Sequence, residues 1–155
     1  MHNINRHTIL YYIVLLLLGM VLQGCQKYSD EDYEGQWQLL EIAEPDGANP
    51  QNVKAQGIYW RMQLGILQII STGMPEDADP GEVIAQYHVS DGKFCITAIY
   101  KSEREADILI TEPEALLIYL PYGLTEVSED FVIETISSSR LVLVSGNKRL
   151  TFRKF

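Results

Sequence analysis

Side chains that could carry out chemistry are sparse beyond residue 24. That part of the chain has one histidine, His88, and two cysteines, Cys25 and Cys95. A lone histidine in a strand is more often structural than catalytic, and one imidazole cannot form a multi-histidine metal site. Cys95 lies in the apolar segment 94–99, where a free cysteine usually packs as a small buried hydrophobe. The pattern therefore predicts structural roles for His88 and Cys95.

Carboxylates are more abundant, and one predicted loop holds Glu76, Asp77, Asp79 and Glu82. Calcium prefers clustered oxygen ligands, but this spacing does not match a calcium-binding loop, and Pro80 interrupts it. The sequence also lacks a nucleophile elbow and a phosphate-cradling glycine loop. We therefore expect no metal site, no cofactor and no enzymatic activity.

The amino terminus is organised like an export signal. Residues 1–8 are polar with one firm positive charge, Arg6, and residues 9–22 are almost purely apolar. A helix needs about 20 apolar residues to cross a bilayer core, so this shorter run fits a signal peptide better than a permanent span. The pattern predicts a signal peptide over residues 1–24.

The end of this run suggests how the chain is held in place. Leu22-Gln23-Gly24-Cys25 resembles the lipobox of bacterial lipoproteins. The resemblance implies that Cys25 receives diacylglycerol, that the chain is cut before it, and that the new amino terminus is acylated. An uncleaved signal anchor with a chance cysteine is the alternative. After cleavage and lipidation Cys95 is the one free thiol left, which excludes an intramolecular disulfide.

Charge and the residues after Cys25 bear on location and partners. The whole chain has a net charge of −9, and removing the segment that holds Arg6 makes it −10. Nucleic acid is not an expected partner, because binding phosphate backbones requires Lys and Arg. The expected membrane attachment is through the lipid. Gln26 replaces the aspartate that usually retains such proteins at the inner membrane, which favours the outer membrane. Residues 25–33 form an acidic tether.

Apolar runs separated by turn signals predict an all-β domain over residues 34–155. In the run 58–71, Ile58, Trp60 and Met62 alternate with more polar residues, as a half-buried strand requires. Asp91-Gly92 between two β-rich runs predicts a hairpin. The predicted strands cover residues 35–43, 58–71, 83–89, 93–100, 107–111, 130–136, 140–144 and 149–155.

Short connections favour antiparallel pairing, and about eight strands can close into an up-and-down barrel. An open sandwich is the main alternative. Two segments stay ambiguous: 58–71 reads as one bent strand or as two strands meeting at Gly65, and 112–122 reads as a short helix or as a strand. We favour the helix, because Pro113 stands near its start.

Several phrases in the domain are similar to lipocalins. Residues 34–39, with Gly35 and Trp37, resemble the Gly-x-Trp opening of that fold. Residues 59–69, 139–144 and 150–155 resemble phrases of bacterial lipocalin-like lipoproteins, and the last two of these phrases overlap the last two predicted strands. The resemblance implies that Trp37 packs at the closed end of a barrel under a basic residue of the last strand. Arg153 is the predicted partner, with Arg149 as the second choice.

The aromatic residues allow two interpretations of the barrel interior. Tyr59, Trp60, Arg61, Tyr87 and Tyr100 are the residues that we expect to line a ligand cavity, which is typically apolar with a few polar groups. The alternative is that aromatic rings simply fill the core. The first interpretation predicts a membrane-anchored, non-catalytic carrier of a small apolar or amphipathic ligand. The second predicts a filled barrel that contacts other cell-envelope proteins, whose identity the sequence does not indicate.

Overall fold

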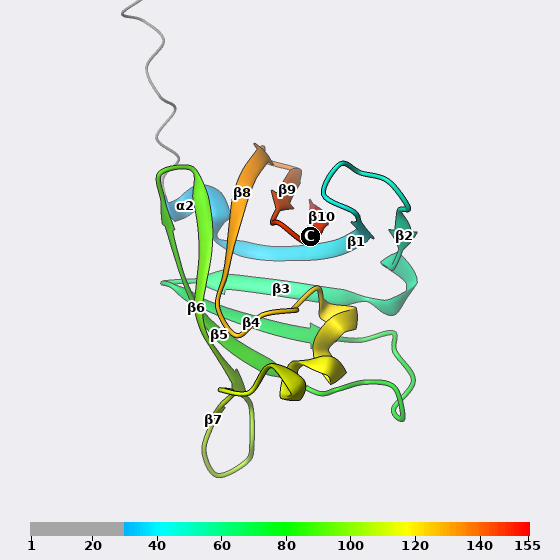
Figure 1. Cartoon of the computed structure of the whole chain (residues 1–155), viewed down its shortest axis with the longest axis vertical. Helices are drawn as coiled ribbons and strands as arrows, with labels where there is room; N and C mark the ends of the chain where they lie inside the picture. The colour runs from blue at the N-terminus through cyan, green and yellow to red at the C-terminus, as the bar shows by residue number, and fades with distance from the viewer. Residues whose placement is uncertain (1–29) are drawn as a thin grey trace, which may run out of the picture.

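The computed structural model describes residues 30–155 (Figure 1). The predictions for the signal peptide, for Cys25 and for most of the tether lie outside the described residues. No helix within residues 30–155 is long and apolar enough to cross a membrane.

Within residues 30–155 eight antiparallel strands follow one another around a closed barrel, each paired with the next along the chain. The prediction of an up-and-down barrel of about eight strands is confirmed. The strands are β1 (Gly35–Ala43), β3 (Ile58–Gln63), β4 (Ile66–Ser71), β5 (Val83–Ser90), β6 (Lys93–Lys101), β8 (Glu129–Ile136), β9 (Arg140–Val144) and β10 (Arg149–Lys154). Two-residue strands, β2 (Gln51–Asn52) and β7 (Ile108–Leu109), pair with β1 and β6.

Pairing of the first strand with the last closes the barrel. Trp37 lies opposite Lys154 and Ala43 lies opposite Arg149, with a register shift between Leu39 and Glu41. A bulge of this kind increases local twist and helps a sheet curl onto itself. Closure removes the exposed edges that an open sheet would present.

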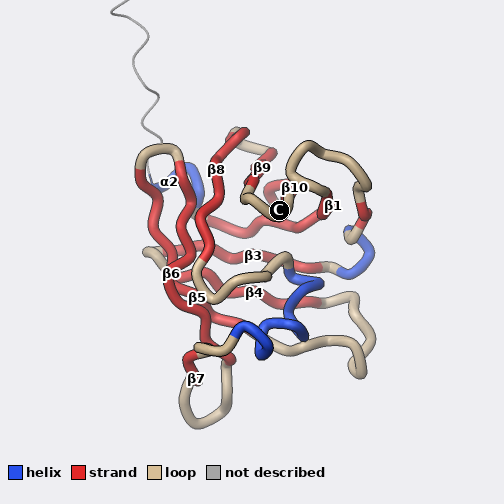
Figure 2. The backbone as a smooth tube through the Cα atoms, viewed as in Figure 1, coloured by secondary structure: helices blue, strands red, loops and turns tan. Residues whose placement is uncertain are grey.

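The two ends of the barrel differ in their connections (Figure 2). We call one the α2 end: it holds the helix α2 (Asp30–Tyr33), the turns 64–65, 91–92 and 137–139, and the carboxyl terminus. We call the other the η2 end: it holds the connections 44–57, 72–82, 102–128 and 145–148. The connection 102–128 contains the 3₁₀ helix η2 (Pro113–Tyr122), and the connection 44–57 contains the 3₁₀ helix η1 (Lys54–Gln56).

Both ambiguous segments are resolved. Residues 58–71 form two strands, because Leu64 and Gly65 have φ values of 51° and 77° and reverse the chain in two residues. Asp91 and Gly92, at 50° and 74°, form the second such hairpin, as predicted. Two left-handed residues in succession are the signature of the tight turn that suits twisted strands. In the segment 112–122, residues 113–122 are helical, with Glu112 as the extended residue before the helix and Gly123 as a left-handed cap.

The turn at Leu64 contains an unusual residue for its conformation. Asparagine, aspartate and glycine are favoured where φ is positive, whereas other residues crowd the following carbonyl. Leu64 is also 83% exposed, so it gains little from packing within the domain.

We expect Leu64→Asn to raise the free energy of unfolding by about 0.5–1 kcal/mol, because asparagine tolerates the left-handed conformation better. Urea denaturation of the domain from Tyr28 onward measures this change. Leu117→Asn is the control, since Leu117 is also exposed but lies in a helix. A stability loss in the Leu64 variant would contradict the account of the turn.

Candidate ligand-binding site

The barrel interior is packed with side chains, many of them aromatic. Trp60 is fully buried at its centre, with its ring centroid 5.0 Å from that of Phe152, 6.4 Å from Phe94 and 6.5 Å from Phe131. Tyr87 stacks on Phe94 with centroids 4.7 Å apart. These rings belong to one continuous apolar cluster that runs through the barrel. The arrangement matches the core-filling interpretation of the aromatic residues.

Two neighbouring tryptophans are hydrogen-bonded to the short helices that cover the two ends of the barrel. Trp37 and Trp60 lie opposite each other on β1 and β3. The Trp37 indole donates a hydrogen bond of 2.7 Å to the carbonyl of Tyr33 in α2, and the Trp60 indole donates one of 3.1 Å to the carbonyl of Tyr122 in η2. Tyr33 and Tyr122 are both fully buried. Each end is therefore covered by a short helix that is hydrogen-bonded to the core.

The predicted cavity residues do not come together. Trp60 and Tyr87 point into the core, whereas Tyr59, Arg61 and Tyr100 are on the outer face of the sheet. Tyr59 contacts Phe155 edge to face, with centroids 5.1 Å apart. The prediction of one shared cavity was wrong for the outer three because side chains alternate between the two faces of a strand. Tyr59 and Arg61 therefore cannot face inward alongside Trp60.

The basic partner of Trp37 is Lys154, and the prediction of Arg153 was wrong by one position. The Lys154 ammonium lies 4.6 Å from the centre of the Trp37 ring and donates a 2.6 Å hydrogen bond to the carbonyl of Glu34. Lys154 shares the inward parity of Phe152. Arg153 points outward, where it donates to Gln38 at 2.8 Å and lies 5.8 Å from the ring of Phe155.

We expect Lys154→Met to lower the free energy of unfolding by about 1–2 kcal/mol, through loss of the cation over Trp37 and of the hydrogen bond. Arg153→Met is the matched variant and should cost less, because the Arg153 side chain is exposed. Chemical denaturation followed by tryptophan fluorescence provides both values. A larger loss for Arg153→Met would restore the original assignment.

A buried ion pair lies at the η2 end. The Lys148 ammonium is 2.7 Å from Oε2 of Glu129, and both side chains are about 95% buried. Lys148 also donates to the hydroxyl of Thr125 and lies 5.4 Å from the centre of the Phe131 ring. Desolvation lowers the pKa of Lys148, and the hydrogen bond and charge of Glu129 partly oppose this effect. The free energy lost when two charges are removed from water is usually about as large as the free energy gained from their attraction.

We expect Lys148→Met to destabilise the domain by about 3–5 kcal/mol, since it leaves the Glu129 charge buried alone. The double variant Lys148→Met with Glu129→Leu should recover most of that loss.

The same ion pair predicts a pH dependence of stability. Folding lowers the pKa of Lys148. Between the pKa of Lys148 in the folded chain and its ordinary pKa, the unfolded chain therefore binds more protons than the folded chain. Wild-type stability should therefore gain with pH across that interval relative to the double variant. Equal stability of Lys148→Met and the double variant would contradict this account.

The acidic loop 72–82 is used for internal contacts. Asp79 accepts a hydrogen bond of 2.8 Å from the hydroxyl of Tyr122, and Glu82 accepts one of 2.7 Å from Gln68. Hydrogen bonding to Asp79 and burial raise the pKa of Tyr122, with burial the larger cause. Among residues 30–155 no group of three or more His, Cys, Asp and Glu side chains could hold a metal ion. His88 is exposed on β5, and Cys95 is buried on β6.

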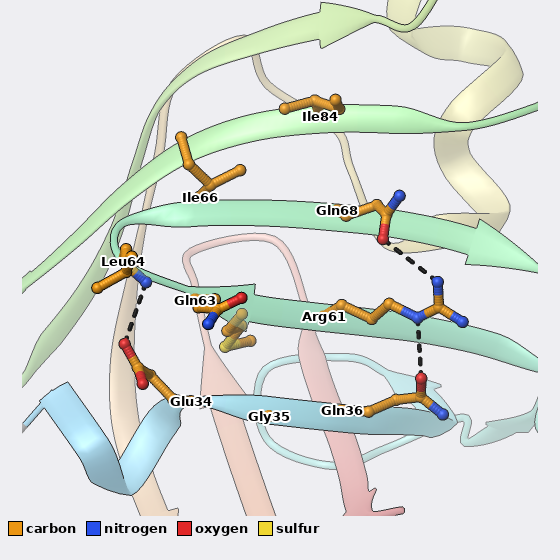
Figure 3. Close-up of a pocket in the computed structure, with 10 residues that line it drawn as sticks. Glu34, Gly35, Gln36, Arg61, Gln63, Leu64, Ile66, Gln68 and Ile84 are labelled. Atoms are coloured by element: carbon orange, nitrogen blue, oxygen red, sulfur yellow. Dashed lines mark hydrogen bonds between the residues drawn. The ribbon is translucent and has the colours of Figure 1, made fainter.

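A groove of about 680 Å³ runs along the outer face of β1, β3 and β4 (Figure 3). Arg61 is central to it and donates hydrogen bonds to the side chains of Gln36, at 2.8 Å, and Gln68, at 3.3 Å. Leu64 and Ile66 extend the groove toward the α2 end. The polar groups at its centre already pair with one another on an open surface, so they are poorly placed to select a ligand.

The η2 end has a smaller and more apolar groove of about 380 Å³, which we call the η2 groove. Ile108, Leu109 and Ile110 form one wall, and Ala115, Ile118 and Tyr119 form the other. Tyr119 is 1% exposed, and its hydroxyl has no hydrogen-bond partner. Burial raises the pKa of Tyr119 and the charge of nearby Lys101 lowers it, with burial the larger cause. A buried hydroxyl without a partner is costly, so a ligand that reached this group and accepted its hydrogen bond would remove that cost.

The sequence interpretation missed Tyr119 because nothing local distinguishes it from Tyr122, three residues later. The two rings lie 6.2 Å apart, but only Tyr122 reaches the acidic loop. Ile108, Leu109 and Ile118 lie in segments that were predicted as a strand or a helix. The hydrophobicity pattern did not indicate that their side chains would be exposed. Their exposed fractions of 56%, 49% and 56% are unusual for isoleucine and leucine, and they depend on the placement of η2.

Comparison with known proteins gives a consistent picture. Residues 20–155 match the model of a family described as a lipocalin-like domain. A solved lipocalin-like protein from Bacteroides uniformis is 24% identical, with a TM-score of 0.57 over 80% of this chain and 99% of that one. An uncharacterized protein from Bacteroides eggerthii is 21% identical, with a TM-score of 0.54 over 79% and 99%. These two structures support the fold alone. No curated protein matches the sequence.

Proposed function

The chain belongs to the lipocalin-like domain family, and from this premise we propose that it is a membrane-anchored, non-catalytic binding protein for a small amphipathic molecule. The lipid on Cys25 attaches it to the outer membrane. The ligand occupies the η2 groove, with its apolar part against the isoleucines and leucine and a polar acceptor at the Tyr119 hydroxyl. The observation that carries this proposal is the unpartnered Tyr119 hydroxyl beside an exposed apolar groove.

The η2 groove suits such a ligand better than the barrel axis does. The axis is filled by the fully buried rings of Trp60, Phe94 and Phe152. The groove instead exposes Ile108, Leu109 and Ile118, whose burial under a ligand stabilises a complex by about 25 cal/mol for each Å² of apolar surface covered. Lys101 and Glu112 also line the groove and supply charged groups for a second polar group of an amphipathic molecule.

The same end supports a second candidate function, an interaction module of the cell envelope. Leu117 and Leu120 are 62% and 44% exposed and continue the apolar surface of η2 beyond the groove. Contiguous apolar surface on a folded domain often marks a site of protein contact. A protein partner would cover Leu117 together with Ile118, whereas a small ligand needs only the residues that line the groove.

Native mass spectrometry of the domain from Tyr28 onward, purified gently from its host, is the first test. A bound small mass that disappears on denaturation supports ligand carriage. A bare protein mass, repeated after incubation with host lipid extract, favours the interaction module.

Variants locate the site with 1-N-phenylnaphthylamine as the fluorescent probe. We expect Ile118→Asp to abolish probe binding in the groove, whereas Leu117→Asp, on the neighbouring exposed side chain, leaves it within about twofold. Tyr119→Phe should raise the stability of the free domain by about 1 kcal/mol, because it removes a buried hydroxyl without a partner. It should also weaken binding of the natural ligand about 2–10-fold.

These opposite effects separate the two roles of Tyr119. Loss of stability in Tyr119→Phe would mean that its hydroxyl is satisfied within the domain. Equal loss of probe binding in both aspartate variants would contradict the assignment of the groove.

A further inference from the structure

Leu64, at the tip of the hairpin between β3 and β4, is an unusual residue for its position in two respects. Its φ of 51° favours asparagine or glycine, and 83% of the leucine is exposed to water. Ile66, two residues on along the same edge, is 44% exposed. Residues that break local rules are expected at functional or strained sites. The exposed, apolar Leu64 tip is therefore a candidate contact surface of the domain.

The tip is held beside the point where the chain enters the domain. The Leu64 amide donates a 3.0 Å hydrogen bond to the carboxylate of Glu34, between α2 and β1 (Figure 3). Asp30, the first residue of α2, stands five residues after Cys25. Five residues span at most about 18 Å when fully extended. A lipid on Cys25 therefore keeps the α2 end close to the bilayer surface.

The distribution of charge also favours an orientation in which the α2 end faces the membrane. The four connections at the η2 end contain twelve acidic and three basic residues. The α2 end, including α2 itself, contains five acidic residues: Asp30, Glu31, Asp32, Glu34 and Asp91. An anionic membrane surface therefore repels the η2 end more strongly than the α2 end. Because the α2 end is itself acidic, it fits a zwitterionic lipid surface better than an anionic one.

We propose that the edge formed by Leu64 and Ile66 docks into the interface of the lipid bilayer and fixes the orientation of the anchored domain. The lipid chains supply the attachment, and burial of Leu64 selects the docked orientation. The η2 groove then faces away from the membrane. This inference rests on the lipid anchor of the proposed function, but it is independent of which ligand the groove binds.

The test uses the mature lipoprotein, purified from membranes and reconstituted in vesicles of phosphatidylethanolamine and phosphatidylcholine. The lipid occupies the thiol of Cys25, and Cys95 is 7% exposed, so an introduced cysteine can be labelled selectively. A nitrobenzoxadiazole label is placed at Gln63→Cys beside the tip, or at Ala106→Cys at the η2 end; both residues are exposed. Intact mass establishes whether Cys25 carries lipid.

We expect the label at residue 63 to shift its emission to the blue on vesicles and to be quenched by doxyl-labelled lipid, while the label at residue 106 shows neither effect. Adding Leu64→Asn should abolish both effects and raise the melting temperature of the free domain by about 1–4 °C. Leu117→Asn, the matched leucine at the η2 end, should leave them unchanged.

The outcomes separate the two proposals. A lipidated protein whose residue-63 label stays in water, or responds equally with Leu64→Asn, overturns docking and leaves the anchor intact. A mass without lipid at Cys25 overturns the anchor and the docking together.

Discussion

The structure depends on closing a barrel whose interior is occupied by buried aromatic rings, among them Trp60, Phe94 and Phe152. Trp37 and Trp60 lie side by side on β1 and β3, and each donates its indole hydrogen to the backbone of a different end closure. A buried indole without an acceptor is costly, so each tryptophan favours the one arrangement in which its short helix is docked. Neither α2 nor η2 would be stable alone, because short helices gain too little from their own hydrogen bonds.

A solid core moves any binding function to the surface. The residues that were expected to line a cavity are divided between the two faces of the sheet, with Trp60 and Tyr87 inside and Tyr59, Arg61 and Tyr100 outside. The inner group belongs to the buried core, whereas outside the barrel Arg61 pairs with Gln36 and Gln68, and Tyr59 contacts Phe155. Five of the nine exposed large apolar side chains within residues 30–155 lie on β7 and η2, so the groove between these two elements is well suited to a ligand.

The sequence predicted the barrel well because its signals are local. Alternating apolar residues, the Asp91-Gly92 turn and the Gly-x-Trp opening each depend on a few neighbouring positions, and each corresponds to an element of the fold. Lys154 shows where local reasoning ends: whether it or Arg153 covers Trp37 depends on the strand register relative to β1, 117 residues earlier. Tyr119 shows the same limit, because its lack of a partner follows from the distances to side chains on other elements.

Closure of the barrel also constrains the order in which the strands can complete their pairing during folding. β1 pairs with β10, so the first strand of the domain cannot complete its hydrogen bonds until the final six-residue strand is available. At about 5–20 residues per second, synthesis of the strands between them takes several seconds or more. Throughout that interval β1 has an unpaired edge and Trp37 lacks the ammonium that covers it. The barrel therefore cannot close until β10 has been made, and the edge of β1 stays accessible to other chains until then.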